Sequence, residues 1–271
     1  MTPASSRWPV IGLFARLVSQ FCGSSENRRP ARPLRFTLTM KGKHNIMNKR
    51  KLTMAASLLL LPALFAQQRF DARVRADFFA GFAGDNKALD RAMTAAEQTI
   101  SRGDGATAEA MAWHGSGLLF QAGDKFAKAD YQGGGEMWSK AVAEADEAGR
   151  REPDNPAVLI PRAAAWFAAS RVSPPQMGKP ILQKALADYE HVYDLQKVFF
   201  DRLGSHPRGE LLFGLADGYA RDGNPEKARF YFSKLAEVGA VSGHLEQAQQ
   251  YLSGDKYAVK GVGCHGCHVE K

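Results

Sequence analysis

The sequence predicts an all-α fold of stacked antiparallel helix hairpins, with about eight helices and flexible N- and C-terminal tails. Apolar residues recur at spacings of three and four along segments that Gly and Pro separate, which is the period of an amphipathic helix. Alternating strand patterns joined by Asn-Gly or Asp-Gly turns are missing from the sequence. One stretch, residues 209–240, has the complete pattern of two short helices folded back on each other. These three observations define the predicted class.

The hairpin of residues 209–240 is predicted from its turn and its two apolar faces. Gly223 ends the first helix, Asn224 can cap the second, and Pro225 sits in the first turn, where a missing N–H costs nothing. The two faces contain large, small and aromatic residues at helical spacing, which are Leu212, Leu215, Ala216 and Tyr219 in the first helix and Ala228, Phe232 and Leu235 in the second.

These seven positions resemble the tetratricopeptide repeat, a helical hairpin of about 34 residues. The pattern here lacks the usual Trp at the fourth position and the Pro near the end, where Ala240 stands. The resemblance implies that several hairpins stack, because one hairpin cannot bury both of its faces. It also implies three or four degenerate units over residues 85–253 and a groove that binds a protein or a peptide.

Residues 67–253 are predicted to form the helical domain. At its start, Phe78, Phe79 and Phe82 are expected to cover the open end of the stack, since terminal repeats are atypical. Further helices are predicted, in chain order, at residues 89–100, 110–120, 138–149, 157–171, 180–203 and 245–252.

Residues 121–136 are predicted to be an irregular connection between two helices. The run Gly133, Gly134 and Gly135 gives this connection a flexible hinge. A functional loop and a tolerated insertion explain its length equally well.

Histidines and acidic residues within the helical domain favour structural roles. His114 and His191 lie between apolar neighbours on predicted helices, and His206 with Pro207 precedes a helix as a cap. The acidic residues of the 180–203 helix are expected on a solvated face, namely Asp188, Glu190 and Asp194. No nucleophile elbow, zinc-protease motif or P-loop is present in the sequence, so no enzymatic activity is predicted.

The formal charge of +8 is concentrated at the start of the chain. Residues 1–66 hold 11 of the 36 basic residues and one of the 28 acidic residues, so residues 67–271 carry 25 basic and 27 acidic side chains, a net of −2. The main signal of nucleic-acid binding is a basic patch on the folded domain. The sequence therefore predicts no nucleic-acid partner.

Residues 47–66 resemble a secretory signal peptide. They combine a positive start at residues 49–51, an apolar core at residues 54–65 and the small residue Ala66 at the cleavage point. The apolar core is shorter than the roughly 20 residues that span a bilayer. We therefore expect export, periplasmic or secreted, with cleavage near Ala66 and no membrane span afterwards. An uncleaved anchor and a buried helix are the alternatives.

Residues 1–46 precede this leader and are predicted to be a disordered extension rich in Arg and Pro. A translation start assigned too far upstream explains the extension most simply, because a signal peptide should begin the chain. An organelle transit peptide is the alternative.

The tail, residues 254–271, contains Cys-His-Gly-Cys-His at residues 264–268, the C-x-x-C-H pattern of covalent c-type haem attachment. Cys264 and Cys267, three positions apart, lie on one side of a helical turn and can form thioethers with the two haem vinyl groups. His268 follows directly and can bind the iron as proximal ligand. Over these five residues the chain resembles c-type cytochromes, which implies one haem c, attachment after export and a redox partner.

Two other interpretations use the same cysteines. A structural zinc site needs four ligands, whereas Cys264 and Cys267 with His265 or His268 offer three at most within the tail. A disulfide or redox dithiol is the other interpretation, and exported proteins commonly contain disulfides. With either of these the chain would be a non-redox interaction scaffold.

Only three residues follow His268, so a haem pocket and a distal ligand are not expected from residues beyond the motif. The pocket would come from the helical body or from a partner chain. His206, His244 or a methionine are candidates for the distal ligand.

Overall fold

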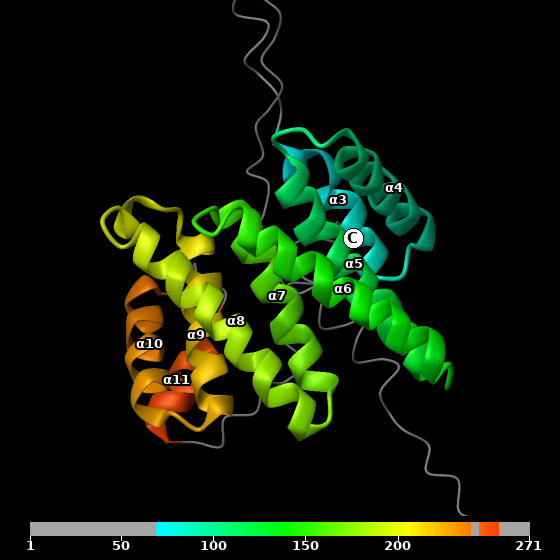
Figure 1. Cartoon of the computed structure of the whole chain (residues 1–271). Helices are drawn as coiled ribbons and strands as arrows, with labels where there is room; N and C mark the ends of the chain where they lie inside the picture. Colours follow the sequence, from blue (N-terminus) through cyan, green and yellow to red (C-terminus); the bar gives the residue numbers. More distant parts are fainter. Residues whose placement is uncertain (1–68, 240–243, 255–271) are drawn as a thin grey trace, which may run out of the picture. The chain divides into compact units, whose positions relative to one another are not determined.

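Helices and short turns make up residues 69–239 and 244–254, the part of the chain that the computed structural model describes. This part contains nine α-helices, a 3-10 turn at Phe200–Arg202 and no strand (Figure 1). In chain order the helices are α3 (Phe70–Phe82), α4 (Asn86–Arg102), α5 (Thr107–Ala127), α6 (Tyr131–Arg151), α7 (Pro156–Val172), α8 (Pro175–Gln196), α9 (Ser205–Asp222), α10 (Pro225–Val238) and α11 (Leu245–Ser253). The predicted all-α class is confirmed.

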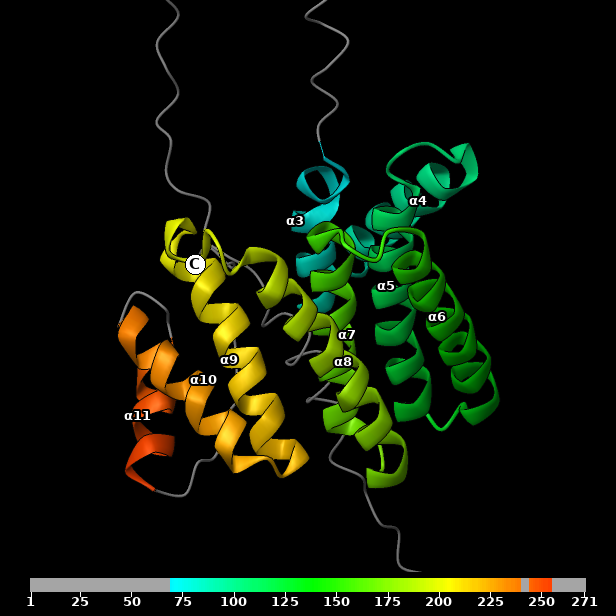
Figure 2. The ribbon, with the colours of Figure 1, turned by 60° about the vertical axis from the view of Figure 1, so that its left-hand side comes forward.

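Successive helices pair into hairpins, and the hairpins stack on one another. Helix α3 packs against α4, α5 against α6, α7 against α8 and α9 against α10, while α11 lies against α10. Figure 2 shows α9, α10 and α11 side by side and α5 next to α6. Neighbouring hairpins meet mainly through α4 with α5, α5 with α7 and α8 with α9. The hairpin predicted at residues 209–240 corresponds to α9 and α10.

Short polar side chains and glycines set the helix boundaries. The turn at residues 223–224 behaves as predicted, because Gly223 ends α9 in the left-handed conformation (φ 81°) and the Asn224 side chain accepts a bond from the Lys227 amide at 3.1 Å. Three further helix starts are capped in the same way, by Asp85, Asp130 and Asn155.

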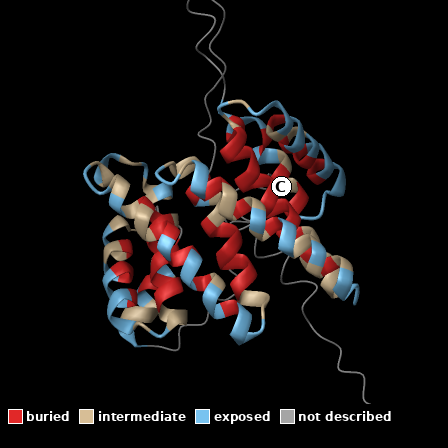
Figure 3. Cartoon of the chain, viewed as in Figure 1, coloured by how far each residue is buried: buried red, intermediate tan, exposed pale blue. Residues whose placement is uncertain are grey.

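The core lies along the first helices of successive hairpins. Residues 107–120 of α5, 163–170 of α7 and 211–219 of α9 are buried around the whole helix, so these helices lack a polar face. Figure 3 shows the buried residues concentrated where helices face one another, and the exposed residues along the outer helices. Phe78 stacks on Trp113 at 5.2 Å between ring centroids, so the aromatic start of the domain closes over α5.

The predicted connection at residues 121–136 is wrong. Helix α5 continues to Ala127 and α6 starts at Tyr131, which leaves a turn of three residues. The Asp130 carboxylate accepts the amide of Gly133 at 2.9 Å, so a cap starts the helix through the glycine run. A Cβ on Gly134 would lie 2.6 Å from the ring of Phe126. The glycine at 134 therefore allows close packing and does not form a hinge.

The helix predicted at residues 180–203 is displaced toward the N-terminus. It starts at Pro175, which occupies the first turn, and it ends at Gln196. The next helix, α9, starts at Ser205 after Gly204, so His206 lies inside its first turn and is not the predicted cap.

Candidate functional site

The predicted haem-attachment residues Cys264, Cys267 and His268 lie outside the described residues, as do residues 1–66 with the predicted leader. The described part of the chain supplies the helical body next to which the tail begins. Its histidines, charge pairs and aromatic residues are the remaining candidates for function.

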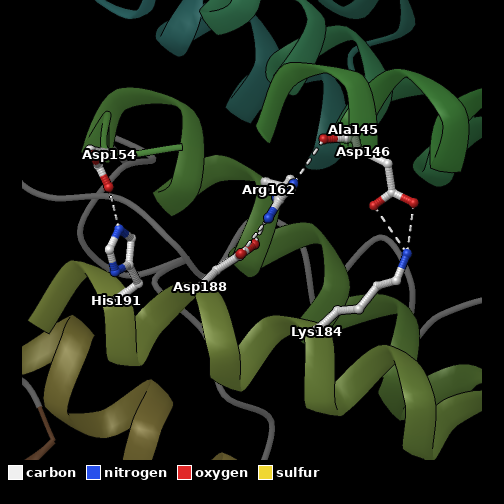
Figure 4. A network of polar contacts seen from close by, with 7 residues as sticks. All are labelled: Ala145, Asp146, Asp154, Arg162, Lys184, Asp188 and His191. Atoms are coloured by element: carbon white, nitrogen blue, oxygen red, sulfur yellow. Dashed lines mark hydrogen bonds and ion pairs between the residues drawn. The ribbon is translucent and has the colours of Figure 1, made fainter. Parts of the chain in front are cut away.

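His114 lies in the core between two glutamates. It is 1% exposed, and its Nδ1 lies 2.5 Å from Oε2 of Glu144 on α6 while its Nε2 lies 3.4 Å from Oε1 of Glu97 on α4. The imidazole therefore links three helices. His191 is a surface residue, with Nε2 2.6 Å from Asp154 on the turn before α7 (Figure 4). His114 is thus a core residue and His191 a surface residue.

His206 and His244, the proposed distal ligands, both approach the carboxylate of Glu210. Nε2 of His244 lies 3.1 Å from Oε1 of Glu210, and Nε2 of His206 lies 3.9 Å from the same oxygen. The ring of His244 stacks on Phe213 with centroids 4.1 Å apart. His244 is thus held at the start of α11 as part of the packing of that helix. Across residues 69–239 and 244–254 no group of three or more His, Cys, Asp or Glu side chains could hold a metal ion.

A buried ion pair joins α6, α7 and α8. Figure 4 shows Arg162 on α7 between Asp188 on α8 and the carbonyl of Ala145 on α6. Nε of Arg162 donates to Oδ2 of Asp188 at 2.8 Å, and Nη2 donates to the other carboxylate oxygen. Burial raises the pKa of Asp188, and the hydrogen bond from Arg162 opposes that effect. The predicted solvated face is wrong for Asp188, because the carboxylate lies under α7.

A second buried carboxylate joins α7 and α9. Asp217 is 1% exposed, and Arg171 on α7 donates to it while Arg221 lies 3.8 Å away on the next turn of α9. Nη2 of Arg221 also donates to Ser170 on α7 at 2.7 Å. The bonds from Arg171 to Asp217 and from Arg221 to Ser170 each join α7 to α9, so they fix the register of one hairpin against the next.

An aromatic row connects the turn after α8 with α10. We define it as Phe200, Tyr193, Tyr231 and Phe230, whose successive ring centroids lie 5.2, 5.6 and 5.0 Å apart. Tyr231 is 6% exposed, but Phe230, at the end of the row, is 50% exposed. The row therefore continues from the core to the surface of α10.

A polar group lies beside the aromatic row. Nζ of Lys227 on α10 donates to Glu190 of α8 at 2.7 Å and to the hydroxyl of Tyr219 on α9 at 2.8 Å. Burial raises the pKa of Tyr219 to about 12 and raises that of Tyr231 as well. The hydrogen bond to Glu190 raises the pKa of Lys227 above its ordinary value.

Sequence reasoning missed the buried charge pairs and the surface end of the aromatic row. Arg162 and Asp188 are 26 positions apart, and helical spacing alone does not show that they meet. The exposure of Phe230 could have been predicted from the sequence, because this residue falls outside the apolar face formed by Ala228, Phe232 and Leu235.

No helix in residues 69–239 and 244–254 combines the length and apolar character that crossing a membrane requires. No protein-family model, curated protein or solved structure matches the chain.

Proposed function

We propose that the chain is an exported helical scaffold that carries one covalently bound haem c and transfers electrons to a partner protein. The observation that carries this proposal is the C-x-x-C-H pattern at residues 264–268. The pattern supplies two thiols and an imidazole within five residues, the donor set that a covalently attached haem requires. When bound, the haem would supply one-electron chemistry.

The cysteines and the histidine have separate tasks. Each thiol, at Cys264 and at Cys267, adds across one vinyl double bond of the porphyrin, so that a C–S bond forms and the thiol hydrogen goes to the neighbouring vinyl carbon. His268 provides a nitrogen ligand on one face of the iron. The sequence at residues 47–66 supports the proposal, because a signal peptide would carry the thiols to a compartment outside the cytoplasm.

The helical body supports the partner-binding part of the proposal. Its stacked hairpins and the pattern in residues 209–240 resemble the tetratricopeptide repeat, in which adjacent hairpins form an extended binding surface. The partner would be a protein or a peptide. Residues 67–271 carry a net negative charge, which argues against a nucleic acid as the partner.

The test is expression of the chain from Met47 in a host that matures c-type cytochromes. We expect a haem-stained band on a denaturing gel and a mass increase equal to one haem. Cys267→Ala should lose the covalent stain, while His265→Ala should keep it, because His265 contributes no thioether. Helical circular dichroism should be unchanged in both variants.

A colourless band of the right mass would overturn the redox proposal. If alkylation then finds no free thiols at Cys264 and Cys267, a disulfide is present. Free thiols with stoichiometric zinc would indicate the structural metal site. Either result leaves a non-redox interaction scaffold.

A further inference from the structure

Helix α5 carries a buried histidine that contacts two neighbouring helices. His114 is 1% exposed, with Glu144 of α6 at one ring nitrogen and Glu97 of α4 at the other. Nδ1 lies 2.5 Å from Oε2 of Glu144, so Nδ1 donates a hydrogen bond to that carboxylate. Nε2 lies 3.4 Å from Oε1 of Glu97, and within the described part of the chain this buried nitrogen makes no hydrogen bond. The contact with α6 is therefore complete, whereas the contact with α4 is not.

The number of protons on the ring decides how Nε2 interacts with Glu97. A neutral imidazole that donates from Nδ1 has a lone pair on Nε2. That lone pair faces the negative carboxylate across 3.4 Å and is repelled by it. The imidazolium carries an N–H on both nitrogens and a positive charge, which the same carboxylate attracts. A second proton therefore turns the contact with α4 from unfavourable to favourable and leaves the contact with α6 in place.

These two carboxylates are the ones that lie within 4 Å of the ring in the residues that the structure describes. Helices α3 and α7 also pack against α5, and they meet the residues next to His114 with uncharged groups. Phe78 of α3 stacks on Trp113. The carbonyl of Pro161 on α7 accepts a hydrogen bond from Ser116 at 3.4 Å. A positive charge on the imidazole is thus balanced by the carboxylates of α4 and α6.

Glu97 connects the buried ring with solvent. Its side chain is 61% exposed, compared with 19% for Glu144. Helix α4 also buries little apolar surface, because three of its six buried residues are alanines. Few large apolar contacts therefore hold α4 in place, and the contact at Glu97 adds to a modest interface.

We propose that His114 is a proton-dependent clamp: its imidazolium holds Glu97 of α4 as well as Glu144 of α6, and loss of the second proton loosens α4 from α5. The proton leaves Nε2 for solvent on the side of the exposed Glu97, and the hydrogen bond from Nδ1 stays. The clamp goes beyond the proposed function and does not depend on haem attachment. It holds the first hairpin of the body, α3 with α4, more tightly at acidic than at alkaline pH.

Amide hydrogen exchange of the full chain tests the clamp. The buried residues Ala92 and Ala96 report on α4. Their protection factors should fall about two- to five-fold from about pH 5.5 to about pH 8, because this range brackets the exchange of an imidazole proton and a partly exposed ion pair has an effect of this size. A protection factor is already corrected for the intrinsic pH dependence of exchange, so the change reports on opening of the helix.

Glu97→Gln is the deciding variant, because it removes the carboxylate from an exposed position. Its α4 amides should have the same protection factors at both pH values. Asp154→Asn is the matched control, since it removes the carboxylate from a surface pair in which Nε2 of His191 lies 2.6 Å from the carboxylate oxygen. This control should keep the pH dependence of α4.

The ring of His114 gives a second measurement, which decides the matter if Glu97→Gln disturbs α4. The nitrogen chemical shifts should show a proton on both ring nitrogens at about pH 5.5 and on Nδ1 only at about pH 8. A ring that keeps one proton at both pH values would overturn the clamp. The same conclusion follows if the protection of α4 does not change with pH, or changes equally in the wild type and in Glu97→Gln. None of these results would affect the proposed haem attachment.

Discussion

At the scale of the residue, the buried pair of Arg162 and Asp188 differs from the surface pairs around it. Figure 4 shows Lys184 of α8 paired with Asp146 of α6. Their side chains are 47% and 42% exposed, compared with 16% and 6% for Arg162 and Asp188. An exposed pair contributes little, because water solvates both charges when the pair is broken. A buried charge that loses its partner has no such replacement.

We therefore expect Asp188→Ala to destabilise the fold by about 3–5 kcal/mol, because Arg162 would remain buried without its carboxylate. Asp146→Ala should cost at most about 1 kcal/mol. Chemical denaturation of the two variants measures both values. Equal losses of unfolding free energy in the two variants would show that burial does not make the Asp188 pair more stabilising than the exposed pair.

At the scale of the element, the glycines at the start of α6 show why composition misled the prediction. Three consecutive glycines favour a flexible connection in isolation. In the structure the Asp130 cap and the contact between Gly134 and Phe126 hold these residues in a helix. Tertiary packing and a single cap thus outweigh the low helix propensity of the run.

Substitutions in this run distinguish a helix from a hinge. A Cβ on Gly135 meets no atom within 4 Å, so Gly135→Ala should stabilise the protein by about 1 kcal/mol. Gly134→Ala should give no such gain, because its Cβ would press on the ring of Phe126. Thermal unfolding of both variants tests this, and a loss of stability in Gly135→Ala would argue for a hinge.

At the scale of the whole molecule, stability depends on contacts between successive hairpins. The group formed by Glu190, Tyr219 and Lys227 connects α8, α9 and α10. In a stack of this kind each unit is stabilised by its immediate neighbours. Loss of such a connection should therefore reduce the stability of more than one hairpin.

Tyr219 makes this connection sensitive to alkaline pH. Its pKa in the folded chain is about 12, whereas an unfolded tyrosine has a pKa of about 10. Between these values the folded state holds a proton that the unfolded state has lost, so stability should fall as pH rises from about 10 to 12. Urea unfolding at a series of pH values measures the slope. Tyr219→Phe should make the slope shallower, and an identical slope would exclude Tyr219 as its source.

The sequence by itself determined the all-α class, the α9–α10 hairpin and its Gly223–Asn224 turn, because helical periodicity and capping are local properties of the chain. It also contains the motif on which the proposed function depends. The tertiary structure decided that Asp188 is buried, that the glycine run is helical and that Phe230 ends an aromatic row at the surface of α10. The first and the last depend on contacts between different helices, and the spacing of residues along one helix does not specify which side chains of another helix will meet them. The glycine run is held by the Asp130 cap and by packing on Phe126 of the preceding helix, which its composition does not reveal.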